Sequence, residues 1–102
     1  MQTFVPDSPI VELVVPSPNH DARQGHSHAD ILLLHYTGMQ STDAALERLC
    51  DTQAMVSSHY LVRENGSVIQ LVPESRRARH AGVSSWESSS DINSRSVGQS
   101  RT

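Results

Sequence analysis

The chain has 102 residues, a length that suits one domain, and a formal net charge of -3. All 8 basic residues are arginines and are outnumbered by 11 acidic ones, so the composition excludes a dominant nucleic-acid-binding surface. No run approaches the roughly 20 apolar residues of a membrane span, and a single cysteine, Cys50, excludes an internal disulfide framework. Residues 1–9 lack the features of a secretory signal, which predicts a cytoplasmic protein, with the periplasm left open if the true start lies upstream.

The first half of the chain predicts two strands and one helix. Four consecutive apolar residues in Ile31–Tyr36 predict a strand that is buried on both faces. Ser41 or Thr42 can cap the helix through a side-chain oxygen, and Cys50 is expected to be a small core residue at its end. In chain order we expect a strand at 11–15, a polar loop at 20–30, a strand at 31–36 and a helix from 41 or 42 to near 51.

The second half begins with a predicted β-hairpin, formed by strands at 58–63 and 67–72. Asn65-Gly66 between them favours a two-residue turn, because both positions of that turn need positive φ. Pro73–Ala78 predicts a short helical turn, since proline suits the first position of a helix.

The last part of the chain is rich in serine: 8 of the 19 residues from Ser84 onward are serines. Such a segment buries too little apolar surface to offset its ordering entropy, so we expect it to lack regular structure.

Six histidines are a high number for this length. His20, His26 and His28 lie in the predicted polar loop, where a solvated role is expected, although His26 and His28 are close enough in sequence to share a metal. His35 is placed differently, because it ends the predicted buried strand and faces the crevice at the edge of the sheet. It is either a metal ligand or a hydrogen-bonded core histidine.

His59 and His80 form a second group of candidate site residues. If their segments lie beside the His35 strand, three imidazoles face one groove; otherwise His59 and His80 hydrogen-bond to the backbone and orient loops. Nearby, Arg76, Arg77 and Arg79 form a basic cluster, which is either a solvated face or a clamp for an anionic ligand.

Several short motifs, in order, resemble those of the zinc-dependent type-2 family of N-acetylmuramoyl-L-alanine amidases, which shares a fold with T7 lysozyme and the peptidoglycan recognition proteins. The first is Leu32–Met39, and the ordered set is far more specific than any single block. The other blocks are Ser17-Pro18-Asn19 with Arg23, Ser57–Val62, Gln70–Glu74, His80–Ser84 with Trp86, and Asp91–Gly98.

The resemblance implies an α/β fold, with a mixed β-sheet flanked by helices and zinc at one edge of the sheet. It implies hydrolysis of the amide between N-acetylmuramic acid and L-alanine, with peptidoglycan or a muropeptide as substrate. Zinc would polarise the carbonyl and activate water. His35 matches the first zinc ligand, and His59 and His80 are assigned to substrate binding.

The chain departs from the family pattern after Gly98. Family members continue with a buried strand that carries a catalytic glutamate, and later segments supply the other zinc ligands, whereas here polar residues 99–102 follow. We therefore expect an N-terminal extension at 1–15, a partial amidase domain at 16–98 whose C-terminal part is missing, and a divergent tail at 99–102. No catalytic residue is assigned, the zinc site is incomplete, and the chain is expected to be inactive or nearly so.

Two other functions are consistent with the sequence. One is a non-catalytic module that binds muropeptides, since the recognition proteins use this fold for binding alone. The other is an unrelated small metal-binding protein that uses His35, His59 and His80, which rests on residue type only.

Overall fold

The computed structural model describes residues 3–25, 29–36, 39, 41–80 and 91–101. A five-stranded mixed sheet has the strand order β1-β5-β4-β7-β3, and β2 and β6 form a second, two-stranded sheet. The elements in chain order are β1 (Val11–Val14), β2 (His20–Ala22), β3 (Ile31–Tyr36), α1 (Thr42–Leu49), β4 (Tyr60–Val62), β5 (Val68–Gln70), β6 (Arg76–Ala78), the 3-10 helix η1 (Ile92–Arg95) and β7 (Ser96–Arg101). The predicted α/β class with a mixed sheet is confirmed.

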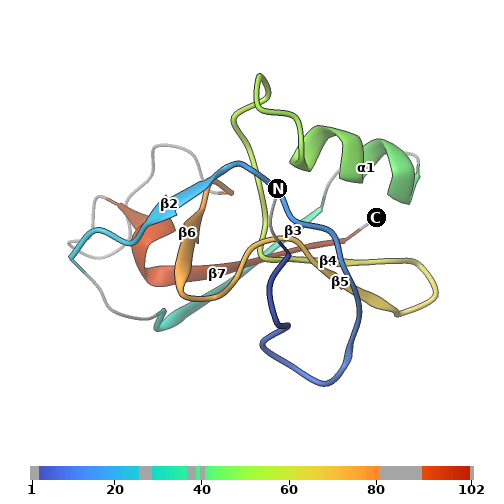
Figure 1. Cartoon of the computed structure of the whole chain (residues 1–102), viewed down its shortest axis with the longest axis horizontal. Coiled ribbons are helices and arrows are strands. Elements are labelled where there is room, and N and C mark those ends of the chain that lie inside the picture. Colours follow the sequence, from blue (N-terminus) through green and yellow to red (C-terminus); the bar gives the residue numbers. More distant parts are fainter. Residues whose placement is uncertain (1–2, 26–28, 37–38, 40, 81–90, 102) are drawn as a thin grey trace.

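Helix α1 covers one face of the large sheet (Figure 1). The side chain of Ser41 caps the helix by accepting a hydrogen bond from the backbone N–H of Ala44 at 3.1 Å, which confirms the predicted start. Ala45 and Leu49 on its inner side pack into the core formed by apolar residues of β4, β5 and the segment after β5. None of the helices in the described part of the chain is long and apolar enough to cross a membrane.

The block Ser17-Pro18-Asn19 ties the end of α1 to the sheet. The hydroxyl of Ser17 donates to the carbonyl of Leu49 at 2.5 Å, and the side-chain amide of Asn19 donates to the carbonyls of Asp51 and Val56, each at 2.8 Å. Ser17 and Asn19 are buried, so these bonds satisfy groups that would otherwise be costly inside the protein. This motif is therefore structural.

The predicted hairpin is confirmed, but its turn is of another kind. β4 and β5 pair antiparallel, with Leu61 opposite Ile69. Gly66 has φ +86°, and among the described non-glycine residues only Met55 has a positive φ, so Asn65 does not. The N–H of Gly66 bonds to the carbonyl of Arg63 at 2.9 Å, as in a three-residue loop that ends with a left-handed glycine.

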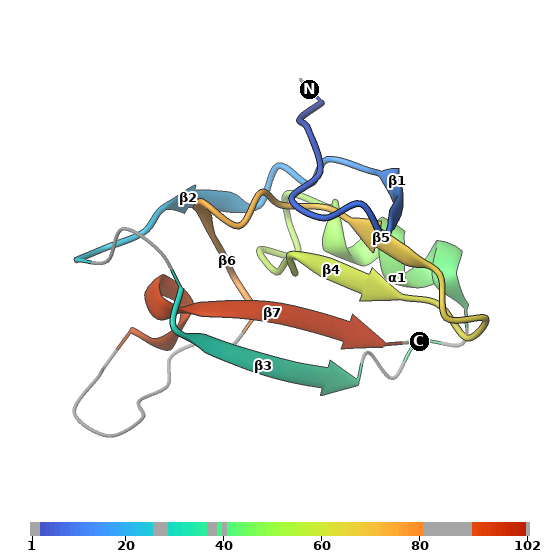
Figure 2. The ribbon, with the colours of Figure 1, turned by 90° about the horizontal axis from the view of Figure 1, so that it is seen from below.

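Strand β3 is an edge strand, which corrects the prediction of a strand buried on both faces. Among the described strands it pairs with β7 only, at the edge of the sheet (Figure 2). Its side chains alternate between the two sides of the sheet. Leu32, Leu34 and Tyr36 on one face are 62%, 68% and 79% exposed. The apolar run predicted the strand correctly and the burial of its outer face wrongly, because composition does not report which neighbours cover a face.

The polar C-terminal segment is ordered, contrary to expectation, over the described residues 91–101. β7 lies between β3 and β4 and runs parallel to both, so its backbone hydrogen-bonds on two sides. Ser96, Gly98 and Ser100 are buried there, where their small size allows close packing. The predicted boundary between residues 98 and 99 falls inside this strand, and β1, within the predicted extension, pairs with β5.

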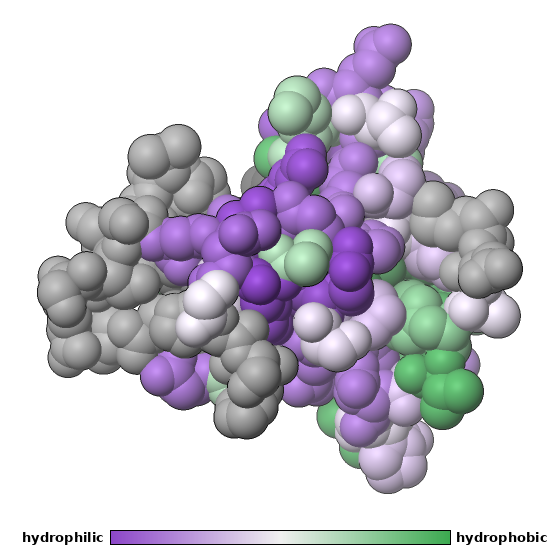
Figure 3. Space-filling model, turned by 60° about the vertical axis from the view of Figure 1, so that its left-hand side comes forward, coloured by the Kyte–Doolittle hydropathy of each residue, from purple (hydrophilic) through white to green (hydrophobic). Residues whose placement is uncertain are grey.

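Two short strands also replace predicted irregular segments. Residues 20–22, expected to be loop, form β2, and residues 76–78, expected to continue a helical turn after Pro73, form β6. The two strands pair antiparallel, and each forms its backbone hydrogen bonds with the other. Because this pairing is long-range, the local sequence of either segment does not predict a strand. Their side of the molecule is mainly hydrophilic (Figure 3).

Candidate functional site

His35 lies near the end of β3 and lines a cavity of about 170 Å³ between the sheet and α1. The register of the sheet places Ser100 of β7 directly beside it. Two arginines, Arg48 and Arg79, also border the cavity. The remaining described lining residues are Tyr36, Met39, Ala45, Leu49, Val56, Ser57 and His80.

The imidazoles of His35 and His80 contact each other at this cavity. Nε2 of His35 lies 2.8 Å from Nδ1 of His80, and Nε2 of His80 lies 2.9 Å from the hydroxyl of Ser96. Burial lowers the pKa of His35, and burial together with the charge of His35 lowers the pKa of His80 to about 3. Both rings are therefore neutral at pH 7, and one donates to the other.

Gly98 makes this histidine pair possible. A Cβ atom at residue 98 would lie 2.5 Å from Cγ of the His80 ring, which is closer than real contacts allow. The glycine therefore lets His80 lie flat against β7 and reach His35. The sequence motif around residue 98 indicated the family but not this steric reason.

His59 is close to His80 but is enclosed by backbone groups. Its ring centroid is 6.0 Å from that of His80, and its side chain is fully buried. The N–H of Gly98 donates to Nδ1 at 3.0 Å, so the proton is on Nε2, which donates to the carbonyl of Arg76 at 2.8 Å. Both ring nitrogens of His59 therefore bond to backbone groups of β6 and β7. Substrate binding by His59 and His80 stays a prediction.

Arg23 is a partly buried clamp that sequence reasoning noted only as part of a motif. Its guanidinium donates to the carbonyl of Glu74 at 2.7 Å and to that of Ser96 at 3.1 Å. It also donates to the carbonyls of Asn93 and Ser94, at 3.2 and 3.0 Å. One side chain thus joins the start of β7 to the segment before β6, and these long-range partners have no local sequence signal.

The three arginines of the predicted basic cluster have different surroundings: Arg76 and Arg77 contact side chains of β2, whereas Arg79 borders the His35 cavity. Arg77 is occupied by carboxylates, with Asp21 at 2.6 Å and Asp91 at 2.7 Å, and its hydrogen bonds hold the pKa of Asp21 below the usual range. Arg76 donates to Nδ1 of His20 at 3.1 Å. Among the described carboxylates, Arg79 contacts only Asp21, at the longer distance of 3.5 Å, and it borders the His35 cavity.

A metal fits these residues only in part. Among the described residues, no group of three His, Cys, Asp or Glu side chains has a geometry that could hold a metal ion. His35 and His80 offer two nitrogens, whereas a catalytic zinc site has about three protein ligands. The suggested metal pair His26 and His28 lies outside the described residues.

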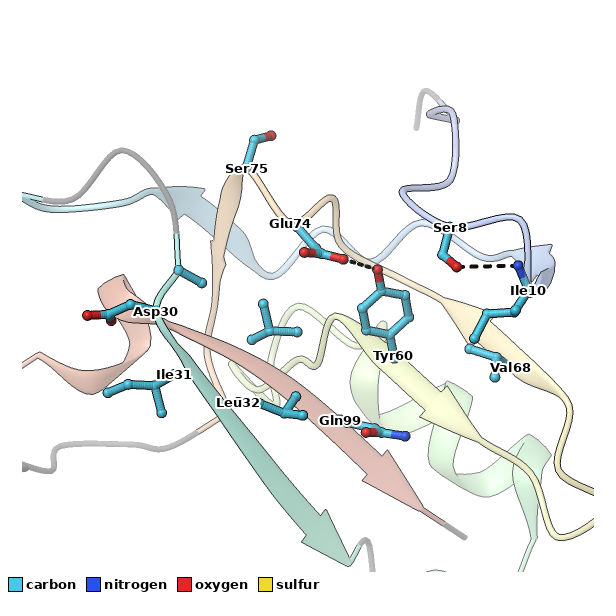
Figure 4. Close-up of a pocket in the computed structure, with 12 residues that line it drawn as sticks. Ser8, Ile10, Asp30, Ile31, Leu32, Tyr60, Val68, Glu74, Ser75 and Gln99 are labelled. Atoms are coloured by element: carbon cyan, nitrogen blue, oxygen red, sulfur yellow. Dashed lines mark hydrogen bonds between the residues drawn. The ribbon is translucent and has the colours of Figure 1, made fainter.

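A larger cavity, of about 800 Å³, lies on the opposite face of the sheet (Figure 4). Leu32, Val68 and Val97 contribute an apolar lining, and the hydroxyl of Tyr60 donates to the carboxylate of Glu74 at its rim. Burial and this carboxylate raise the pKa of Tyr60. Since the histidines are on the other face, this cavity is separate from the candidate site.

Comparison with known proteins gives the same family as the sequence motifs. Residues 25–100 match the sequence profile described as N-acetylmuramoyl-L-alanine amidase. The chain is 40% identical over 84 residues to the N-acetylmuramoyl-L-alanine amidase AmiD of Escherichia coli, covering 76% of this chain and 29% of AmiD. It is 32% identical over 101 residues to the 1,6-anhydro-N-acetylmuramyl-L-alanine amidase AmpD of Citrobacter freundii, covering 82% of this chain and 54% of AmpD.

Solved structures agree in fold. A selenomethionine AmpD crystal structure superposes with a TM-score of 0.81 at 26% identity, covering 99% of this chain and 65% of that one. A complex of E. coli AmiD with anhydro-N-acetylmuramic acid-L-Ala-D-gamma-Glu-L-Lys superposes with a TM-score of 0.64 at 39% identity, covering 79% and 33%. The chain thus spans about half or less of the length of these curated relatives.

Proposed function

Since this chain belongs to the N-acetylmuramoyl-L-alanine amidase family, we propose that it binds muropeptides in the His35 cavity, as part of the machinery that cleaves the muramoyl–alanine amide. The observation that carries the proposal is the position of His35. It lies near the end of β3, beside β7 and against His80, within the residues that match the family profile. Family membership excludes the alternative of an unrelated metal-binding protein.

The reaction is addition of water across the amide. Hydroxide adds to the lactyl carbonyl carbon, the C–N bond breaks, and the nitrogen of L-alanine takes a proton. Zinc is the cofactor that the family resemblance implies, with His35 as a ligand, and it supplies Lewis acidity when bound. The donor set in the described part of the chain is incomplete, so no step is assigned to the metal.

The residues of this cavity suit binding better than rapid hydrolysis. General acid–base catalysis works best with a group whose pKa is near the working pH, and contributes about 10²–10⁴-fold. The pKa of His80 is about 3, and the described lining residues include no carboxylate. We therefore propose that the 102-residue chain binds muropeptides and releases stem peptide at a background rate.

Binding and hydrolysis are tested separately on the same ligand. Titration of the purified chain with anhydro-N-acetylmuramic acid-L-Ala-D-gamma-Glu-L-Lys by calorimetry should show saturable binding that His35→Ala weakens. Mass spectrometry of the same mixture, with zinc added, should show no L-Ala peptide above a protein-free control. If peptide is released and the release is lost in His35→Ala, the chain is an active amidase and not a binding module. If the ligand does not bind, the proposal is overturned.

Zinc content is a third, independent measurement. We expect substoichiometric zinc after dialysis, because His35 and His80 provide only two nitrogens. One tightly held zinc per chain, measured by atomic emission, would show that further ligands complete the site.

A further inference from the structure

The charged groups that border the His35 cavity are arginines. Arg48 projects from the last turn of α1, and Arg79 follows β6, so two separate elements bring guanidinium groups to the same small space. The described residues that line the cavity include no aspartate or glutamate. An anion is therefore the ligand that complements this cavity.

Within the described part of the chain, neither guanidinium group has all of its donors occupied by carboxylates. Arg48 is exposed, and within the described part of the chain it has no carboxylate within 4.0 Å. Arg79 lies 3.5 Å from Asp21, whose carboxylate already accepts two shorter hydrogen bonds from Arg77, at 2.7 and 2.6 Å. Donors of both guanidinium groups thus remain for a ligand.

The size of the cavity restricts what can enter it. A volume of about 170 Å³ corresponds to roughly six water molecules at about 30 Å³ each. That is room for one amino-acid side chain or a carboxylate with its neighbouring carbons. Guanidinium groups match carboxylates through paired hydrogen bonds, which favours a carboxylate of the stem peptide over a neutral group.

We propose that Arg48 and Arg79 form a subsite that binds the free α-carboxylate of γ-linked D-glutamate in the muropeptide stem. The inference rests on the proposed function. In the ligand of the AmiD complex glutamate is joined through its γ-carboxyl group, and this linkage leaves the α-carboxylate free. The subsite selects stems with a free carboxylate over stems in which that group is amidated.

The test uses two ligands that differ in one group. Anhydro-N-acetylmuramic acid-L-Ala-D-gamma-Glu-L-Lys, in which lysine occupies the γ-carboxyl group, carries the free α-carboxylate, and its D-isoglutamine analogue carries a neutral amide in the same place. Calorimetry with the wild-type chain should show tighter binding of the acid by roughly 10- to 100-fold, the range expected for hydrogen bonds to a charged group. Raised salt should narrow the difference.

Substitutions assign the preference to the two arginines. Arg48→Gln and Arg79→Gln should each weaken binding of the acid by about tenfold or more and leave binding of the amide within about twofold. Arg48→Lys, which keeps the charge but not the planar fork, should retain an intermediate preference. Arg63→Gln is the matched control, because Arg63 pairs with Glu12 near the β4–β5 turn and does not line the cavity.

The outcomes separate the two proposals. Equal binding of acid and amide by the wild-type chain, or a preference that survives both glutamine substitutions, would overturn the subsite and leave muropeptide binding intact. Failure to bind either ligand would overturn both proposals. Circular dichroism of each variant checks the fold, which these partly or largely exposed side chains should not affect.

Discussion

The buried histidine His59 should make the chain unstable in mild acid. Burial lowers its pKa from 6.5 to about 4, although its hydrogen bond to the carbonyl of Arg76 opposes that shift. His59 therefore binds a proton near pH 6.5 in the unfolded chain, but only near pH 4 in the folded chain. Unfolding is favoured as the pH falls through this window, and at neutral pH the effect disappears.

The size of this effect follows from the two pKa values. Linkage gives a loss of about 2 kcal/mol of unfolding free energy at pH 5 and about 3 kcal/mol at pH 4, relative to pH 8. Small domains have only about 5–15 kcal/mol in total, so this loss should be easy to measure. Urea unfolding followed by circular dichroism, at steps of one pH unit from 8 to 4, provides the curve.

The matched variant is His59→Asn. Asparagine does not titrate in this range, and its carbonyl oxygen occupies the place of Nδ1, where it can accept the N–H of Gly98. Other histidines titrate in both proteins, so the difference between the two curves isolates His59. We expect the wild-type chain to lose about 2–3 kcal/mol more than the variant between pH 8 and pH 4. Parallel curves would refute the argument that His59 is buried and neutral.

Three further predictions concern packing. Gly98→Ala should cost about 1–3 kcal/mol of unfolding free energy, because the new methyl group displaces the His80 ring; an unchanged urea midpoint would contradict this close approach. Arg23→Met should cost at least about 2 kcal/mol, because several carbonyl groups lose their donor; a loss under about 0.5 kcal/mol, the usual size for surface sites, would show that the clamp is not stabilising. Leu32→Lys with Leu34→Lys should reduce binding of a hydrophobic dye and light scattering with little change in stability, since both side chains are exposed; equal dye binding would place the apolar surface elsewhere.

Local features of the fold could be predicted from the sequence. The Ser41 cap defined the start of α1, and the glycine of Asn65-Gly66 defined the hairpin, because both signals act within a few residues of chain. His35 was identified from the family motif that covers most of strand β3. Its partner geometry was not, since the contact with His80 depends on the absence of a side chain at residue 98.

Segments whose structure depends on distant partners were mispredicted. β7 is composed largely of small polar residues, and its order comes from hydrogen bonds to β3 on one side and β4 on the other. β2 and β6 likewise exist as a pair. Propensity counts the residues of a segment alone, so it underestimates a strand whose backbone is satisfied by neighbours far away in sequence.

The formation of strand β7 also determines the geometry of the candidate site. Both imidazoles pack against residues of β7. Ser100 lies beside His35, and Ser96 contacts His80. Gly98 leaves the space that the His80 ring occupies. Arg23 fixes the start of the same strand through the carbonyl of Ser96. A change in Arg23 should therefore weaken muropeptide binding at a distance from the ligand, by loosening β7, whereas a change in Arg48 should act on the ligand's charge and leave β7 in place. The acid and amide ligands distinguish these routes, because a loosened β7 weakens the binding of both and a lost guanidinium weakens the binding of the acid alone.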